Sequence, residues 1–417
     1  MTLPPRRVVV TGIGVVTSLG HGVDVFWSRL IGGASGLRQI TRFDTRRFIT
    51  SFAGEVDGLE GLVQDRFVEG AVLAARQAIA QSQDVPRSAN VLIGTAFGGV
   101  ESLANGQFDR SFAWNAANAL AAVLDTDGDV LTYQASFTGS ANAIGEGFER
   151  IRRGRSNVAV VGGSEAAITP SIVAGFIAMG ATSLSTGNPA EAVKPFALDR
   201  DGCAIGEGSA VIVLEEWEHA VERGAPMLAE VAGYGTTADA EHVVALPPDG
   251  DGIVRAMRLA LDQADLQPEA IDYINAHGTG TSMNDAIETV AMKQVFGAAA
   301  ASIPISSTKP ATGHLLGAAG ALEAVIVIQS LRTGIVPPTL NLNHADPACD
   351  LDYVPLIARH VSPAIVMSNS MGFGGHAVSL IFRRVTGFHL PEPNDADDQV
   401  EHRDQRGGQE SLTHAMG

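Results

Sequence analysis

Short β-branched runs that end in glycine or serine recur along the whole chain and alternate with alanine-rich segments of helical length. The first run, at residues 8–10, leads into Gly12 and Gly14, which we interpret as turns at the end of a strand. Strands are also expected at 91–94, 158–163, 210–214, 271–278, 303–307 and 364–368, with helices at 67–80, 253–263 and 318–331. This alternation predicts an α/β protein with layered helices and buried sheets.

The order of elements indicates an internal repeat. One block opens with a strand and a glycine turn near Val8, and a second block opens in the same way at residues 228–235. We therefore predict an N-terminal half at residues 1–233 and a C-terminal half at residues 234–387. Residues 388–417 are polar, rich in Asp and Gly and without periodicity, which predicts a disordered tail outside the fold.

Charge and cysteine content narrow the class of function. The formal net charge is −18, so nucleic acid and anionic membrane surfaces are expected to repel the chain. The two cysteines, Cys203 and Cys349, are too few for a disulfide framework or a Cys-rich metal site, and we interpret both as packing residues in a reducing, cytoplasmic protein. Because the cysteines are so few, no metal is expected. Gly12 and Gly14 lack the spacing of a dinucleotide-binding loop, so no bound cofactor is expected either.

Two histidines lie in long motifs of small and polar residues. His277 is in NAHGTGT at 275–281, directly after an expected strand, where an imidazole can face a cleft. Lys309 precedes His314 by five residues in STKPATGHLLGAAG, and a third motif, NSMGFGG, begins at Asn369. In this order the three motifs are similar to those of the β-ketoacyl-ACP synthase family, the type II condensing enzymes, and the resemblance extends from the first strand to about Val385.

The resemblance implies a thiolase fold, with two pseudo-repeated halves in a five-layer α-β-α-β-α arrangement, and usually a dimer. In this family a cysteine at the start of a buried helix takes an acyl group from an acyl carrier protein, and two histidines support decarboxylation of malonyl-ACP. By motif position His277 and His314 correspond to those histidines, and Lys309 matches the lysine that maintains the electrostatics and geometry of the site. Thr279 and Thr281 match positions that bind the phosphopantetheine arm of the carrier protein, which is expected to carry the substrate.

The sequence departs from the family pattern at the nucleophile. The cysteine of the pattern corresponds to Phe137, in the segment QASFTGSAN at 134–142. A benzyl side chain has no lone pair that can attack a thioester, so covalent acyl transfer through this position is excluded. Ser136 is adjacent, but an offset of one residue at a helix start rotates a side chain by about 100°, so we interpret Ser136 as a cap.

Two further departures concern the acyl pocket. Many relatives have a phenylalanine that gates this pocket where the NSMGFGG motif has Met371, and Met371 and Phe373 are therefore candidate substrate-binding residues. Methionine is more flexible than phenylalanine, which changes the expected gating. Residues 100–137 are shorter than the corresponding family region, which contributes to the pocket floor and the dimer contact.

These residues leave several functions open, and whether the chain is an enzyme is one of the open points. The first hypothesis is a subunit that resembles a chain-length factor and pairs with an active ketosynthase of fatty acid or polyketide biosynthesis, as a heterodimer or a homodimer. The second is a malonyl-ACP decarboxylase that uses His277 and His314 while Phe137 imitates an acylated cysteine. A carrier-protein docking module and a condensing enzyme with an unusual nucleophile at Ser136 are the remaining alternatives.

Overall fold

The computed structural model describes residues 5–386, and the tail predicted at 388–417 lies outside these residues. Most strands belong to one 11-stranded sheet, in which ten strands have the order β11-β10-β14-β15-β9-β1-β8-β7-β5-β6 and the eleventh, β2 (Gly20–His21), pairs with β1 beside this path. The N-terminal strands are β1 (Val8–Thr17), β5 (Asn90–Gly94), β6 (Val130–Tyr133), β7 (Val158–Glu165) and β8 (Gly208–Glu216). The C-terminal strands are β9 (Ala229–Ala238), β10 (Tyr273–Asn275), β11 (Ile305–Ser306), β14 (Ile365–Gly372) and β15 (His376–Arg383).

The two groups of strands repeat one topology. In the N-terminal group β6, β5 and β7 are parallel, and β8 and β1 continue antiparallel. In the C-terminal group β11, β10 and β14 are parallel, and β15 and β9 continue antiparallel. The groups meet where β1 pairs with β9 through Val8–Val10. This repetition agrees with two similarly built halves, while the division at residue 233 stays a prediction.

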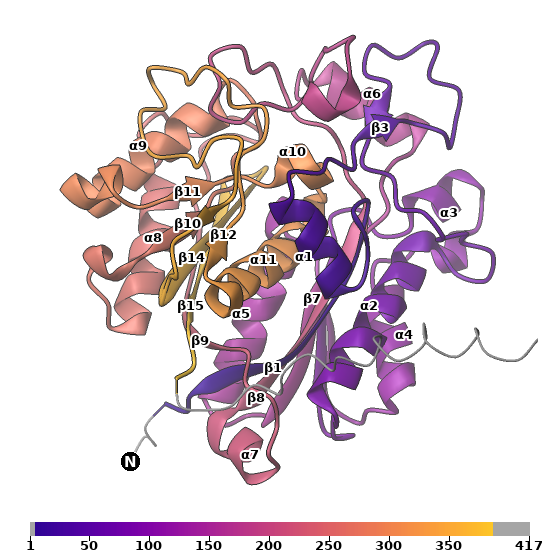
Figure 1. Cartoon of the computed structure of the whole chain (residues 1–417). Helices are drawn as coiled ribbons and strands as arrows, with labels where there is room; N and C mark the ends of the chain where they lie inside the picture. The colour runs from indigo at the N-terminus through magenta and orange to yellow at the C-terminus, as the bar shows by residue number, and fades with distance from the viewer. Residues whose placement is uncertain (1–4, 387–417) are drawn as a thin grey trace, which may run out of the picture.

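Helices cover both groups of strands and also separate them. Helices α2 and α4 lie on the outer face of the N-terminal strands, and α8 and α9 lie on the outer face of the C-terminal strands, while α5 and α11 pack against each other in the middle (Figure 1). This gives the expected five-layer α-β-α-β-α arrangement. The helices named here are α2 (Arg66–Ser82), α4 (Asn115–Leu124), α5 (Gly139–Arg152), α8 (Asp251–Ala264), α9 (Asn284–Phe296) and α11 (Ala319–Thr333).

Shorter elements connect these layers. The remaining helices are α1 (Val23–Ile31), α3 (Val100–Ala104), α6 (Pro170–Ala178), α7 (Trp217–Glu222) and α10 (Lys309–Thr312), and the 3₁₀ turns η2 (Ser136–Thr138) and η6 (Leu316–Ala318) precede α5 and α11. The remaining strands are β2 (Gly20–His21), β3 (Arg38–Gln39), β4 (Phe52–Ala53), β12 (Ile335–Val336) and β13 (Arg359–His360). Helix α6 and the two 3₁₀ turns reach the site described below.

The interpretation of Gly12 and Gly14 as strand-end turns was wrong. Strand β1 runs through both glycines as far as Thr17. A Cβ atom at Gly12 would lie 2.0 Å from the carbonyl oxygen of Ala78, and one at Gly14 would lie 1.9 Å from that of Ala74. Both glycines therefore allow the backbone of α2 to pack directly on β1, which a sequence pattern does not distinguish from a turn.

The two central helices are apolar because both lie inside the protein. Among residues 5–386, the segment Leu316–Thr333 is long and apolar enough to cross a membrane, and 89% of it is buried within the structure. Small residues allow α11 to approach α5 closely, since a Cβ at Gly320 would lie 2.7 Å from Cβ of Ala141. The composition of α11 is thus that of a core helix between two sheets.

Candidate active site

The two central helices begin with the same unusual backbone turn. Ser136 in η2 has φ 51°, and Leu316 in η6 has φ 50°. Positive φ is uncommon for residues other than glycine and costs of order 1 kcal/mol. Its occurrence at both helix starts therefore indicates that the two halves share one backbone turn. The first turn places Phe137 at the start of α5, and the second follows His314.

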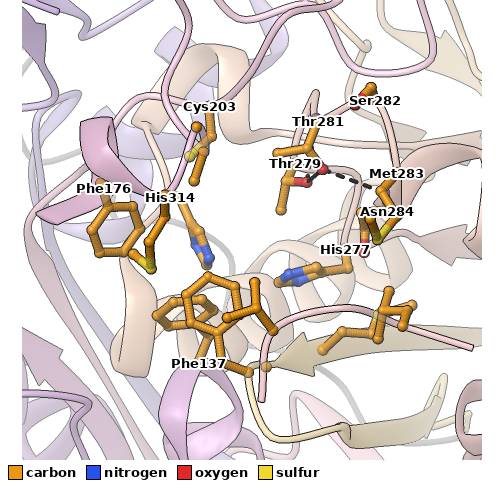
Figure 2. Close-up of a pocket in the computed structure, with 18 residues that line it drawn as sticks. Phe137, Phe176, Cys203, His277, Thr279, Thr281, Ser282, Met283, Asn284 and His314 are labelled. Atoms are coloured by element: carbon orange, nitrogen blue, oxygen red, sulfur yellow. Dashed lines mark hydrogen bonds between the residues drawn. The ribbon is translucent and has the colours of Figure 1, made fainter. Parts of the chain in front are cut away.

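His277 and His314 meet between these helix starts. Their ring centroids are 5.2 Å apart and their planes are inclined by 82°. Figure 2 shows both imidazoles pointing into the space between them. Nδ1 of His314 accepts a hydrogen bond from the backbone N–H of Leu316 at 3.3 Å. Within the part of the chain that the structure describes, Nδ1 of His277 and Nε2 of His314 have no hydrogen-bond partner.

Both imidazoles are neutral at neutral pH. Burial lowers the pKa of each far below its usual value, and repulsion from the Lys309 ammonium lowers both further. A neutral imidazole carries one proton, and because Nδ1 of His314 accepts a hydrogen bond, its proton is on Nε2. His314 therefore presents an N–H donor to the pocket without a net positive charge.

Lys309 lies behind His277 and does not line the pocket. Its ammonium donates to the backbone carbonyl of His277 at 2.5 Å and to Oε1 of Glu323 at 2.5 Å. Lys309 and Glu323 are 1% and 3% exposed, so this is a buried ion pair. On the opposite side of His277, the carboxylate of Glu288 accepts from the N–H groups of His277 and Gly278 at 2.8 and 2.9 Å. Lys309 thus positions His277.

Phe137 forms the apolar side of the same space. Its ring centroid lies 4.8 Å from that of His314, 4.7 Å from Phe373 and 6.0 Å from Phe176. Phe176 belongs to α6, and no motif signalled it. Its position was not predictable from the sequence, because a phenylalanine in an apolar helix resembles any other core residue. The polar imidazoles therefore face an aromatic cluster made of Phe137, Phe176 and Phe373.

A cavity of about 190 Å³ connects these groups to the surface. Thr279 and Thr281 lie on its wall, with their hydroxyl oxygens 2.9 Å apart. Met371 also lines it and is 3% exposed. The structure thus brings together all the predicted site residues except Lys309, which lies behind the wall. The lining residues are Phe137, Phe176, Met179, Gly180, Ala181, Cys203, Val244, Leu246, His277, Thr279, Thr281, Ser282, Met283, Asn284, His314, Met371, Gly372 and Phe373.

Cys203 is buried, which agrees with its interpretation as a packing residue, and it also lines this cavity. Its segment pairs with the segment that carries His314, so the thiol and the imidazole share one region of the wall. Cys349 is buried in a separate apolar cluster with Tyr353 and agrees with a packing role. The chain from residue 5 to 386 contains no group of three or more His, Cys, Asp or Glu side chains that could hold a metal ion.

Comparisons with known proteins match nearly the whole described chain. Residues 5–220 match the family model of the beta-ketoacyl synthase N-terminal domain, and residues 228–343 match that of the C-terminal domain. The chain is 41% identical over 411 residues to a 3-oxoacyl-[acyl-carrier-protein] synthase 2 of Synechocystis sp., covering 92% of this chain and 99% of the relative.

Solved structures of ketosynthases also match nearly the whole described chain. A type II polyketide synthase acyl-carrier protein in complex with its ketosynthase contains a chain that matches with a TM-score of 0.85 and 33% identity. The ishigamide ketosynthase/chain length factor matches with a TM-score of 0.84 and 35% identity. Each match covers 91% of this chain and 100% of the other chain.

Proposed function

The chain belongs to the β-ketoacyl synthase family and has the thiolase fold, and from this premise we propose that it decarboxylates malonyl groups carried on an acyl carrier protein. The products are carbon dioxide and acetyl-ACP, and no acyl-enzyme forms. The observation that carries this proposal is the pair of buried, neutral imidazoles with unpartnered nitrogens, which lie beside Phe137 in one cavity.

Decarboxylation needs stabilisation of an oxygen, and it needs no nucleophile. When carbon dioxide leaves, the electrons of the broken carbon–carbon bond pass into the thioester carbonyl, and an enolate forms. An N–H donor aimed at that oxygen stabilises the developing charge, and one such donor is typically worth about 10²–10³ in rate. Nε2–H of His314 and the single N–H of His277 are suited to this task. The enolate carbon then takes a proton from water.

Phe137 supports the same proposal by what it cannot do. By motif position it replaces the family's cysteine at the start of α5, where a helix N-terminus would lower the pKa of a thiol. The aromatic ring instead fills the space beside His314 that an acyl group on that cysteine would use. The site is thereby held in a form that resembles the acylated state, in which only the malonyl group remains to react.

The carrier protein is the proposed partner in this reaction. Thr279 and Thr281 line the cavity and lie above His277 in Figure 2, and their hydroxyl groups can bind a phosphopantetheine arm there. The acetyl-ACP product belongs to fatty acid or polyketide biosynthesis, where it serves as a primer.

The test is to incubate the purified protein with malonyl-ACP and to measure acetyl-ACP by mass spectrometry. We expect catalytic formation of acetyl-ACP by the wild type and by a Cys349→Ala control, whose substitution is not among the residues that line the cavity. A His314→Ala variant should lose the activity. If the wild type forms no more acetyl-ACP than His314→Ala, the protein is not a decarboxylase.

A second candidate function is a partner subunit that resembles a chain-length factor. It is favoured by the aromatic cluster of Phe137, Phe176 and Phe373, which closes the side of the cavity where a growing acyl chain would start. The similarity to the ishigamide ketosynthase/chain length factor supports it as well. The test is co-expression with the ketosynthase encoded nearest to it. Purification as a homodimer without affinity for that ketosynthase would exclude this role.

A further inference from the structure

We propose that Glu165 is a positioning residue of this site, because its carboxylate holds the starts of α5 and α11 in the arrangement that places His314 beside Phe137. Glu165 is the last residue of β7 and is 1% exposed. It does not belong to the residues that line the cavity, so it acts through other groups. The inference rests on the proposed function only in its effect on the rate, since the state of the His314 ring can be measured without a substrate.

The carboxylate of Glu165 accepts four hydrogen bonds from two segments that are distant in the sequence. Its Oε1 accepts from the hydroxyl group of Thr95 at 3.1 Å and from the N–H of Phe97 at 3.2 Å. Its Oε2 accepts from the N–H of Ala96 at 2.6 Å and from the N–H of Gly317 at 3.1 Å. The first segment follows β5 in the N-terminal half, and Gly317 lies in η6 of the C-terminal half. Oε2 therefore joins the two halves.

All four partners are donors, so this position requires a group that only accepts hydrogen bonds. Burial raises the pKa of Glu165 to about 7, and the four donors oppose this rise. A glutamine of the same size would turn its NH₂ group towards one pair of donors and leave that pair without an acceptor. The ionised carboxylate is therefore the form that fits these surroundings.

The bond to Gly317 is one residue away from the bond that orients the His314 ring. The N–H of Leu316 donates to Nδ1 of His314 at 3.3 Å, and the next N–H along the chain, that of Gly317, donates to Glu165. Leu316 has φ 50°, and such a residue keeps its strained conformation only where surrounding contacts hold it. Glu165 supplies such a contact. Its removal would let the η6 turn relax and move the N–H that selects the His314 tautomer.

The other hydrogen bonds of the carboxylate hold a segment that contacts both helix starts. A Cβ atom at Gly94 would lie 2.1 Å from the backbone nitrogen of Ser140 in α5, and one at Gly317 would lie 2.1 Å from that of Ala96. The segment after β5 thus packs directly against the start of α5 and against η6. Glu165 binds this segment through three hydrogen bonds and η6 through the fourth, so it fixes the separation of the two helix starts.

The test compares Glu165→Gln with Glu215→Gln. Glu215 is 0% exposed, but it binds Arg223 and His219 at the end of β8 that is far from Glu165. The protein is labelled with ¹⁵N-histidine, and the His314 signals are identified by their absence from a labelled His314→Ala variant. The ¹⁵N chemical shifts of a histidine show which ring nitrogen carries the proton.

We expect the His314 proton on Nε2 in the wild type and in Glu215→Gln, because Nδ1 accepts the bond from Leu316. In Glu165→Gln the proton should be shared between Nδ1 and Nε2, because the η6 turn is released. The kcat of malonyl-ACP decarboxylation should fall by up to about 10²-fold with little change in KM, because a donor to the enolate is misplaced while the cavity wall is unchanged.

Unchanged His314 signals in a folded Glu165→Gln would overturn the inference, and so would a loss of kcat no larger than that of Glu215→Gln. If Glu165→Gln does not fold, Thr95→Val takes its place, because it removes one donor and keeps the carboxylate. Its His314 signals should shift in the same direction by a smaller amount, and unchanged signals would again refute the role. A wild type that forms no acetyl-ACP would disprove the proposed function alone, because the ¹⁵N measurement would still decide the role of Glu165.

Discussion

The starts of α5 and α11 have the same backbone geometry, but one presents an apolar aromatic ring and the other follows an imidazole. Each follows a 3₁₀ turn whose residue has φ near 50°, Ser136 in one half and Leu316 in the other. The α5 start presents Phe137, whereas the α11 start follows His314. The backbone of the site is therefore set by the fold in both halves, while the reacting groups depend on single side chains. A substitution at one of these helix starts changes the group presented to the cavity without changing the backbone turn.

On the C-terminal side of the site, buried charged groups surround the backbone of His277. Lys309 and Glu323 form a buried ion pair, and Glu288 binds the backbone at His277. Removing one partner of a buried ion pair costs about 3–5 kcal/mol. Loss of either Lys309 or Glu323 would therefore destabilise the folded site. The N-terminal half has a buried ion pair of its own, between Arg66 and Glu207, but the contacts around Phe137 itself are aromatic. The predictions below change one side at a time.

The largest expected effect is on the histidine side. Replacing His277 or His314 by Ala should lower the rate of malonyl-ACP decarboxylation by about 10²–10³-fold, because each change removes one donor to the enolate oxygen. The double variant should be little slower than the single variants, because the two donors act on one oxygen. Acetyl-ACP formation measures this, and losses below about tenfold would show that the imidazoles do not stabilise the enolate.

The next change restores a thiol on the aromatic side. Phe137→Cys should gain an acyl group at position 137 from acyl-ACP, because the α5 start lowers the pKa of a thiol there. Phe137→Ala is the matched control, since it opens the same space without a nucleophile. Peptide mapping by mass spectrometry locates the adduct. If the folded Phe137→Cys variant gained no adduct at position 137, a thiol alone would not be enough to make the start of α5 reactive.

The sequence predicted those parts of the site that lie in motifs. His277, His314 and Phe137 meet as expected, and the family and five-layer fold are confirmed. Phe176 and Glu323 were missed, because each is an isolated residue in an apolar or small-residue segment and gains its role only when distant segments pack together. Gly12 and Gly14 were misplaced for a related reason: a glycine that admits a neighbouring helix has the same local signature as one that ends a strand.

A smaller effect compares a buried carboxylate of each half. Burial raises the pKa of Glu288 to about 7, well above the value near 4.5 of an unfolded chain. Between these values the folded protein binds more protons, so this group lowers the free energy of unfolding as pH rises, by up to about 1.4 kcal/mol per pH unit. Glu288→Gln should remove this contribution, so its stability deficit relative to wild type should narrow from pH 5 to pH 7.

Chemical denaturation at several pH values measures the deficit. Glu165, at the end of β7, is a buried carboxyl group of the other half, and burial also raises its pKa to about 7. The stability deficit of Glu165→Gln relative to wild type should therefore also narrow from pH 5 to pH 7. Buried histidines act oppositely below pH 6.5, but they are common to all three proteins and cancel in the differences. A deficit that is constant with pH would show that Glu288 stays charged in the folded state.

The last expected effect is at the crossing of the two central helices. Gly320→Ala should destabilise the protein by about 1–3 kcal/mol, because the new methyl group would meet Cβ of Ala141 at 2.7 Å and α5 and α11 must separate. Gly175→Ala on α6 is the control, because a Cβ there meets nothing within 4 Å. Since η2 with Phe137 leads directly into α5, and η6 after His314 leads into α11, separating the helices should also widen the gap between these rings. A thermal shift without loss of decarboxylation would show that the two helix starts are positioned by their strands rather than by each other.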